Sequence, residues 1–129
     1  MKIAIDMDGT ICTWHPRDYD RAEVLDGRAA RVRELARLGH EIWIYTARGS
    51  GDPGPEGAEA RWGEVTRAQL RRWEIPYDRL IFGKPPFDLL IDDRAIAVAG
   101  DWVDEVRKRE TNADDTDAAS GMDAPRPSA

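Results

Sequence analysis

A short acidic motif at residues 6–10, DMDGT, constrains the fold of this chain more than any other feature. It directly follows the apolar run 3–5, IAI, which is typical of a short buried strand. Because side chains alternate along an extended chain, Asp6 and Asp8 are predicted to point to the same side. Two carboxylates at the carboxyl end of a buried strand indicate an open α/β sheet with a site at that edge. We also expect a cation between them, because an unpaired buried charge is costly.

Strand-like and helix-like segments alternate along the rest of the chain. The expected strands are 2–6, 40–46, 80–82 and 88–91, with a short edge strand at 95–99, and the expected helices are 27–38, 58–73 and 102–110. Asp26 is predicted to cap the first helix and Gly39 to end it. This alternation predicts an α/β fold, a parallel sheet with helices on both faces.

The composition predicts one globular domain followed by a tail. The chain has 129 residues, of which 41% are hydrophobic and 34% charged, which suits a soluble domain at residues 1–110. Residues 111–129 are rich in Ala, Asp, Ser and Pro, and we expect a disordered acidic tail there. No apolar run has membrane-spanning length and no signal peptide is evident, so we expect a cytoplasmic protein. The single cysteine, Cys12, is expected to be a small buried residue rather than a reactive thiol.

Charge and aromatic content bear on the partners of the chain. The net charge is −6, and residues 1–110 are themselves net acidic without an evident basic stripe, so a nucleic-acid partner is not expected. Five tryptophans are many for this length. Filling the core is the favoured interpretation, and a contact between copies of the chain in a homo-oligomer is the alternative.

Four polar clusters follow the expected strands in turn. They are Asp6 with Asp8, then Thr46, then Lys84, and finally Asp92-Asp93. Taken singly, each has an ordinary explanation as a turn former, a strand end or a surface charge. Parallel strands bring their carboxyl ends to one edge, so the clusters are predicted to converge. Four acids at one place would repel each other unless a divalent cation neutralised them.

The order of these motifs resembles that of the haloacid dehalogenase (HAD) superfamily, in its phosphatase branch. The resemblance spans residues 2–94 and implies a Rossmann-like fold, dependence on Mg²⁺ and a phosphoaspartate intermediate. The stretch 75–96 further looks like the small phosphatases of capsular polysaccharide biosynthesis. The loop at 49–57 is too short to be the cap domain that many members carry, so the chain resembles the capless members.

The resemblance also implies roles for the acids. Asp6 would be the ionised nucleophile, and Asp8 would begin protonated and act as general acid and then base. Asp6, the backbone carbonyl of Asp8 and Asp92 would hold the Mg²⁺, with Asp93 behind them as a further member of the metal site.

The remaining motif residues would handle the phosphate. The hydroxyl of Thr46 and the amide of Ala47 would bind its oxygens, and Lys84 would balance the charge of the transferred phosphoryl group. With Asp8 protonated, the negative charges of the other motif acids equal the positive charges of Mg²⁺ and Lys84, so an incoming phosphate dianion needs a further cation. Arg48 is the best candidate to supply it and so to bind the substrate. An ordinary surface ion pair is the equally weighted alternative for Arg48.

These observations favour a Mg²⁺-dependent phosphomonoesterase that acts through an aspartyl-phosphate on a small phosphorylated metabolite, such as a sugar phosphate. The alternative is a polynucleotide end (3′-) phosphatase, because the capless form also resembles the phosphatase module of polynucleotide kinase-phosphatases. A phosphoaspartate signalling receiver is a third reading. It is disfavoured because this chain places its acid pair last and has no acid at the end of the second strand.

Overall fold

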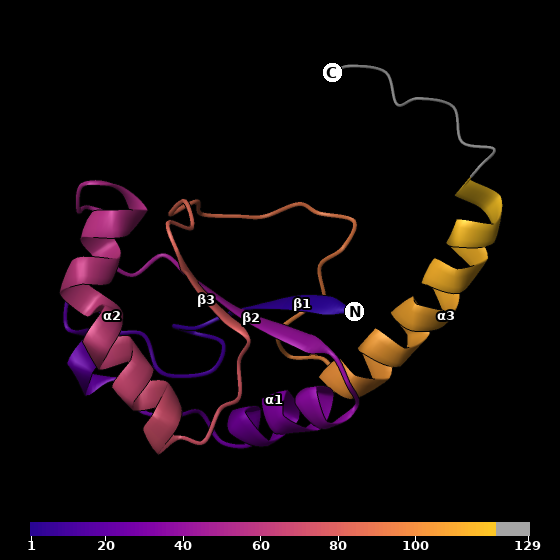
Figure 1. The fold of residues 1–129 in the computed structure, drawn as a ribbon, viewed down its shortest axis with the longest axis horizontal. Coiled ribbons are helices and arrows are strands. Elements are labelled where there is room, and N and C mark those ends of the chain that lie inside the picture. Colours follow the sequence, from indigo (N-terminus) through magenta and orange to yellow (C-terminus); the bar gives the residue numbers. More distant parts are fainter. Residues whose placement is uncertain (121–129) are drawn as a thin grey trace, which may run out of the picture. The chain divides into compact units, whose positions relative to one another are not determined.

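The protein is described here by a computed structural model that defines the backbone of residues 1–120 and the side chains of residues 1–111. The chain divides into two compact units, Met1–Ala95 and Ile96–Ala129. The first unit holds three strands and two α-helices, and the second holds one helix (Figure 1).

The first unit is built on a three-stranded parallel sheet. Its strands are β1 (Lys2–Asp6), β2 (Glu41–Thr46) and β3 (Arg79–Phe82), in the order β1-β2-β3. Asp6 lies opposite Tyr45, and Thr46 lies opposite Phe82, so the three carboxyl ends meet at one edge. The predicted α/β, Rossmann-like class is confirmed, and within the described residues no cap domain is inserted between the strands.

Two helices connect these strands, and both differ from their predicted bounds. Helix α1 spans Arg28–Arg37 and begins after Gly27, whose φ of 75° and lack of a capping side chain show that the predicted cap at Asp26 was wrong. Gly39, with a φ of 95°, follows the helix as predicted. Helix α2 spans Gly54–Arg72 and starts earlier than predicted, because proline is well tolerated in the first turn of a helix.

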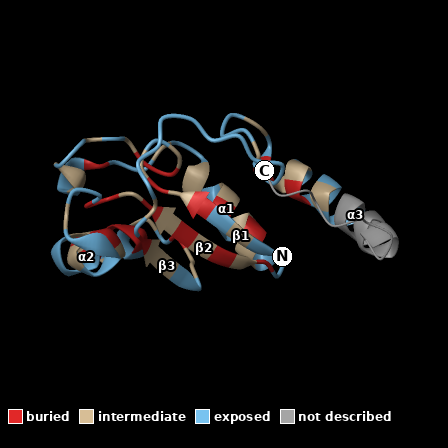
Figure 2. Ribbon diagram, turned by 90° about the horizontal axis from the view of Figure 1, so that it is seen from above, coloured by how far each residue is buried: buried red, intermediate tan, exposed pale blue. Residues whose placement is uncertain are grey.

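The two faces of the sheet differ in how completely their side chains are buried. Along β2, buried residues alternate with half-buried ones, as Figure 2 shows. Ile42 and Ile44 are fully buried, whereas Trp43 and Tyr45 on the opposite face are covered only in part. The guanidinium of Arg79 lies 4.8 Å from the ring centre of Trp43. This second face is an aromatic surface that also contacts cationic side chains.

The fourth and fifth strands predicted from the sequence are wrong. Between β3 and α3, no residue of the described backbone belongs to a strand. Leu89 and Ile91 are 81% and 94% exposed and Leu90 is 52% exposed, so the apolar run at 88–91 is largely open to solvent. Pro85 and Pro86 precede this run and separate it from β3. A four-residue apolar run indicates a strand only if a neighbouring edge pairs with it, and this run has no such pairing.

The second unit contains helix α3, which spans Trp102–Ser120. Trp102 is buried and its indole N–H donates to the carbonyl of Val98 at 3.0 Å. The helix continues past its predicted end at 110 into the region expected to be a disordered tail, and residues 121–129 of that tail lie outside the described residues. None of the helices among the described residues is both long and apolar enough to cross a membrane.

Candidate active site

The turn after β1 fixes the first acid of the motif. The carbonyl of Met7, which is fully buried, accepts hydrogen bonds from the backbone N–H groups of Thr10, Ile11 and Cys12 at 3.1, 2.8 and 3.2 Å. Gly9 adopts a φ of 85°, a left-handed conformation that suits glycine. The hydroxyl of Thr10 donates to Oδ2 of Asp6 at 2.8 Å. Asp6 is therefore held by its own turn.

Lys84 follows β3, which is separated from β1 by β2, and it pairs with Asp6 at the end of β1. Its Nζ lies 2.9 Å from Oδ1 of Asp6, and its backbone N–H donates to the carbonyl of Thr46 at 3.2 Å. Gly83, just before it, has a φ of 95°, and a Cβ there would lie 2.6 Å from a carbon of Pro55. The chain thus turns sharply against α2 and carries Lys84 to the end of β1. The side chains of Lys84 and Asp6 are 17% and 34% exposed, so solvent and substrate can reach both.

Arg48 is buried and anchors the second acid. Its Nε and Nη2 each lie 2.9 Å from an oxygen of Asp8, which is the two-bond fork typical of arginine and carboxylate. Its Nη1 donates to the side-chain oxygens of Thr66 at 3.0 Å and Gln69 at 2.6 Å, both on α2. Its guanidinium carbon lies 5.1 Å from the ring centre of Tyr19.

This geometry corrects the role expected of Arg48. Its side chain is completely buried and all three guanidinium nitrogens donate hydrogen bonds within the protein, so it has no free face for a substrate. The surface ion pair that was the alternative does not describe it either. Arg48 is a positioning residue, which holds Asp8 in place.

The two ion pairs also change the expected charge balance. Asp6 pairs with Lys84 and Asp8 pairs with Arg48, so two negative charges meet two positive ones. Each acid thus has its own side-chain cation, from the end of β3 for Asp6 and from the loop after β2 for Asp8. Sequence reasoning missed three supporting residues of this arrangement, Tyr19, Thr66 and Gln69. The sequence did contain a signal for two of them, because Thr66 and Gln69 are polar residues one helical turn apart on the face of α2 that is buried.

The loop after β2 carries the residues expected to bind phosphate. Thr46 is buried, and its Oγ1 accepts a hydrogen bond from the backbone N–H of Arg48 at 3.1 Å. The carbonyl of Ala47 accepts from the N–H of Ser50 at 3.0 Å. Because Lys84 is bonded to the carbonyl of Thr46, this loop lies beside the Asp6–Lys84 pair. Thr46, Ala47, Lys84 and the two acids are therefore brought to one place.

Asp92 and Asp93 are not brought to that place. Both are exposed, and Oδ1 of Asp92 accepts the backbone N–H of Arg94 at 2.8 Å, which forms a local turn. Among the residues whose side chains the structure describes, no three His, Cys, Asp or Glu groups gather so that they could hold a metal ion. Each oxygen of Asp6 and Asp8 already accepts a hydrogen bond. The donors are chemically suited to magnesium, but as they lie they do not assemble its site.

Cys12 lies directly beneath the second acid. It is fully buried, and its Sγ lies 3.6 Å from both Oδ1 of Asp8 and the carbonyl of Met7. Burial, followed by the charge of Asp8, raises the pKa of the thiol to about 12, although Arg48 opposes the shift. The thiol is thus protonated at neutral pH, and the expectation of a small buried residue is confirmed.

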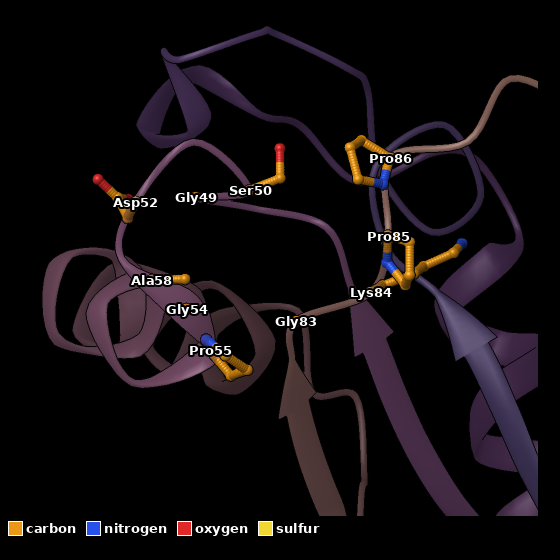
Figure 3. A pocket seen from close by; sticks show the side chains of 10 residues that line it. All are labelled: Gly49, Ser50, Asp52, Gly54, Pro55, Ala58, Gly83, Lys84, Pro85 and Pro86. Carbon is orange, nitrogen blue, oxygen red and sulfur yellow. The ribbon is translucent and has the colours of Figure 1, made fainter.

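Two hollows adjoin the loop at residues 49–52. The smaller, about 160 Å³, is lined by Lys84 and the prolines that follow it on one side and by the start of α2 on the other (Figure 3). The larger, about 370 Å³, lies between this loop, α2 and the irregular segment at residues 11–23, which is called the flap below. Gly49 borders both, and a Cβ there would lie 2.8 Å from Ala58, so the loop packs closely on α2.

No protein-family model and no curated protein match this chain. Among solved structures, a structural-genomics target from Vibrio cholerae is similar to it, with 27% identity and a TM-score of 0.66 over 87% of this chain and 99% of the other. A chain of the Pnkp1/Rnl/Hen1 complex has a TM-score of 0.51 with 19% identity, over 71% of this chain and 30% of the other. A chain of the Pnkp1/Rnl/Hen1 RNA repair complex has a TM-score of 0.50 with 18% identity, over 88% of this chain and 31% of the other. The last two likenesses concern the fold.

Proposed function

We propose that this protein is a HAD-type phosphomonoesterase in which Asp6 attacks the phosphorus of a small phosphorylated metabolite. The observation that carries the proposal is the unequal pairing of the two acids. Asp6 pairs with a partly exposed lysine through one of its oxygens, whereas Asp8 is held through both oxygens by a fully buried arginine. One acid is thus free to exchange its partner for a substrate, and the other is held in a fixed orientation.

The first step follows from the Asp6–Lys84 pair. An entering phosphoryl group offers oxygens that compete with Oδ1 of Asp6 for the ammonium of Lys84. When the ammonium moves to the phosphoryl group, Oδ1 is released and forms a bond to phosphorus as the bond to the leaving oxygen breaks. In the second step water attacks phosphorus, and the carboxylate of Asp6 leaves. Thr46 and Ala47 lie beside this pair and are proposed to bind the phosphate oxygens.

Asp8 is proposed to move the protons of both steps. As a carboxylate it would first accept a proton from the phosphate ester entering as its monoanion, pass that proton to the leaving oxygen, and then take one from the attacking water. Oδ1 of Asp8 accepts from Arg48 and from the thiol of Cys12, whereas Oδ2 accepts from Nε of Arg48 alone. A carboxylate oxygen has two lone pairs, so Oδ2 keeps one for this proton. The family resemblance implies that magnesium, when bound, would stabilise the charge of the phosphoryl group.

Two observations bear on the substrate. The net acidic charge of residues 1–110 and the small size of both hollows favour a small metabolite, such as a sugar phosphate. The second candidate, a polynucleotide 3′-phosphatase, is favoured by the fold that the chain shares with chains of an RNA repair complex.

The test is phosphate release from a panel of sugar phosphates, other phosphorylated metabolites and a 3′-phosphorylated oligonucleotide, with magnesium and with a chelator. We expect turnover of at least one small ester, and better turnover of that ester than of the oligonucleotide. Asp20→Asn, which changes an exposed acid outside the site, should retain this activity. Absence of phosphate release from every ester contradicts the proposed function, and preference for the oligonucleotide transfers it to the second candidate.

A further inference from the structure

The larger hollow has the chemistry of a binding pocket and is used by no step above. It measures about 370 Å³ and lies between the loop at 49–52 and four side chains of the flap and α2, namely Arg17, Tyr19, Arg61 and Trp62. This volume is in the range of pockets that bind small molecules.

Two aromatic rings form a rigid wall of the pocket. The ring centres of Tyr19 and Trp62 lie 4.8 Å apart and their planes are nearly perpendicular, at 87°. Tyr19 also contacts Arg48 through its ring and accepts a hydrogen bond from the amide of Gln69 through its carbonyl at 2.7 Å. The wall is therefore attached to the residues that position Asp8.

The charges of the pocket do not cancel. Arg61 pairs with Asp52 at 3.2 Å and lies over the ring of Trp62 at 5.2 Å. Arg17 is exposed and makes no hydrogen bond or ion pair within the part of the chain whose side chains are described. Its backbone has a φ of 62°, which is uncommon for a residue other than glycine and frequent at ligand sites. Two guanidinium groups thus face one carboxylate, which leaves one positive charge unmatched.

The pocket is close to the expected phosphate site. Its floor, Gly49–Asp52, begins three residues after Thr46 in the chain. Since a residue spans at most about 3.6 Å, Ser50 lies within roughly 14 Å of Thr46. A phosphate ester of moderate size, held at Thr46 and Lys84, can therefore place its far end in the pocket.

We propose that this pocket binds a second anionic group on the leaving group of the substrate, so that the preferred substrate is a small phosphate ester that also carries a carboxylate or a second phosphate. Arg17 supplies the unmatched positive charge, and the Tyr19–Trp62 wall packs against the carbon skeleton. The inference rests on the proposed function for its reaction, but binding in the pocket does not require turnover.

The first test compares two open-chain esters of one carbon skeleton, 6-phosphogluconate and sorbitol 6-phosphate, of which only the first carries a carboxylate. We expect Arg17→Ala to lower kcat/KM for 6-phosphogluconate roughly tenfold or more, because a charge-assisted contact is lost. The same variant should change turnover of sorbitol 6-phosphate less than about twofold. Arg21→Ala is the matched control, since Arg21 is an exposed arginine of the same flap that does not line the pocket. An equal effect of Arg17→Ala on both esters, or no effect on either, overturns the inference.

The second test measures binding without turnover. Saturation-transfer NMR compares gluconate with sorbitol, which has a similar skeleton and no charge. We expect a gluconate signal with the parent protein and with Arg21→Ala, a much weaker one with Arg17→Ala, and little from sorbitol. If no ester is hydrolysed but this pattern appears, the proposed function fails and the anion pocket stands. If gluconate binding is absent or survives Arg17→Ala, the pocket is not an anion site, whatever the activity.

Discussion

Two acid pairs of this protein follow apolar runs in similar ways and end in very different surroundings. Asp6 and Asp8 follow β1, where Ile5 is only 6% exposed, and each has a cationic partner at 2.9 Å. Asp92 and Asp93 follow a run in which Ile91 is 94% exposed, and both are open to solvent. The local sequence is alike, and the packing beneath it is not.

The difference shows what fixes a functional side chain in place. The first pair is held because β1 is bonded to β2, and because α2 supplies partners that bury Arg48. In the second pair, Asp92 accepts the backbone N–H of Arg94 in a local turn, and both acids are exposed. An exposed acid is already solvated by water and needs no cation, whereas the partly buried Asp8 needs its arginine. The comparison separates acids that affect both stability and chemistry from acids that can affect chemistry alone.

The largest effect is expected at the first pair. Asp6→Asn should lower turnover roughly 10⁴-fold or more, because it removes the attacking oxygen and the partner of Lys84. Phosphate release by the purified variant measures this, with Asp20→Asn as the control and circular dichroism to show that the fold persists. Activity within tenfold of the parent would remove Asp6 from the role of nucleophile.

The next effect concerns stability. Arg48→Ala should lower the free energy of unfolding by about 3–5 kcal/mol, because it leaves the carboxylate of Asp8 without its buried partner. Thr66 and Gln69 would also lose their hydrogen bonds to it. Urea denaturation measures the change, with the exposed Arg21→Ala as the matched control. Arg48→Lys should not restore stability, because an ammonium cannot make the two-bond fork. A loss below about 1 kcal/mol for Arg48→Ala would show that the pair is not an anchor.

A smaller effect on stability is expected at the second pair. Asp92→Asn and Asp93→Asn should each change the free energy of unfolding by less than about 0.5 kcal/mol without metal, as is usual for exposed positions. With magnesium, the family resemblance predicts that Asp92→Asn raises the concentration needed for half-maximal activity more than Asp93→Asn does. Denaturation and magnesium titrations measure the two quantities. A marked loss of stability without metal would show that this segment packs on the domain, and equal magnesium requirements would remove the distinction between the two acids.

The smallest effect concerns Cys12. Its raised pKa, about 12 against an ordinary value of 9.0, means that the unfolded chain loses the thiol proton first as pH rises. The contribution of the protonated Cys12 thiol to the free energy of unfolding is therefore complete below about pH 9 and is lost between about pH 9 and 12. Cys12→Ala should accordingly show a shallower loss of stability over that range than the parent. Iodoacetamide at neutral pH should label the parent only after denaturation, and rapid labelling of the folded protein would contradict a buried, protonated thiol.

The sequence predicted the parts of the site that depend on local pattern and on strand direction. Apolar runs indicated the three observed strands, and the parallel arrangement placed Asp6, Thr46 and Lys84 at one edge. The sequence could not predict the partners of Arg48, because Thr66 and Gln69 reach it only once α2 is packed. The same limit applies to the run at 88–91, whose composition favours a strand but whose pairing depends on the rest of the fold.

The account depends most on the identity of Asp6 as the group that receives the phosphate. Rapid acid quenching of the parent protein during turnover of its best ester, followed by peptide mass spectrometry, tests this directly. We predict one added phosphoryl group on the peptide that contains residues 1–11, carried by Asp6 and absent from the Asp6→Asn variant. A phosphoryl group on any other residue, Asp92 or Asp93 included, during active turnover would contradict the assignment and the contrast between the two acid pairs.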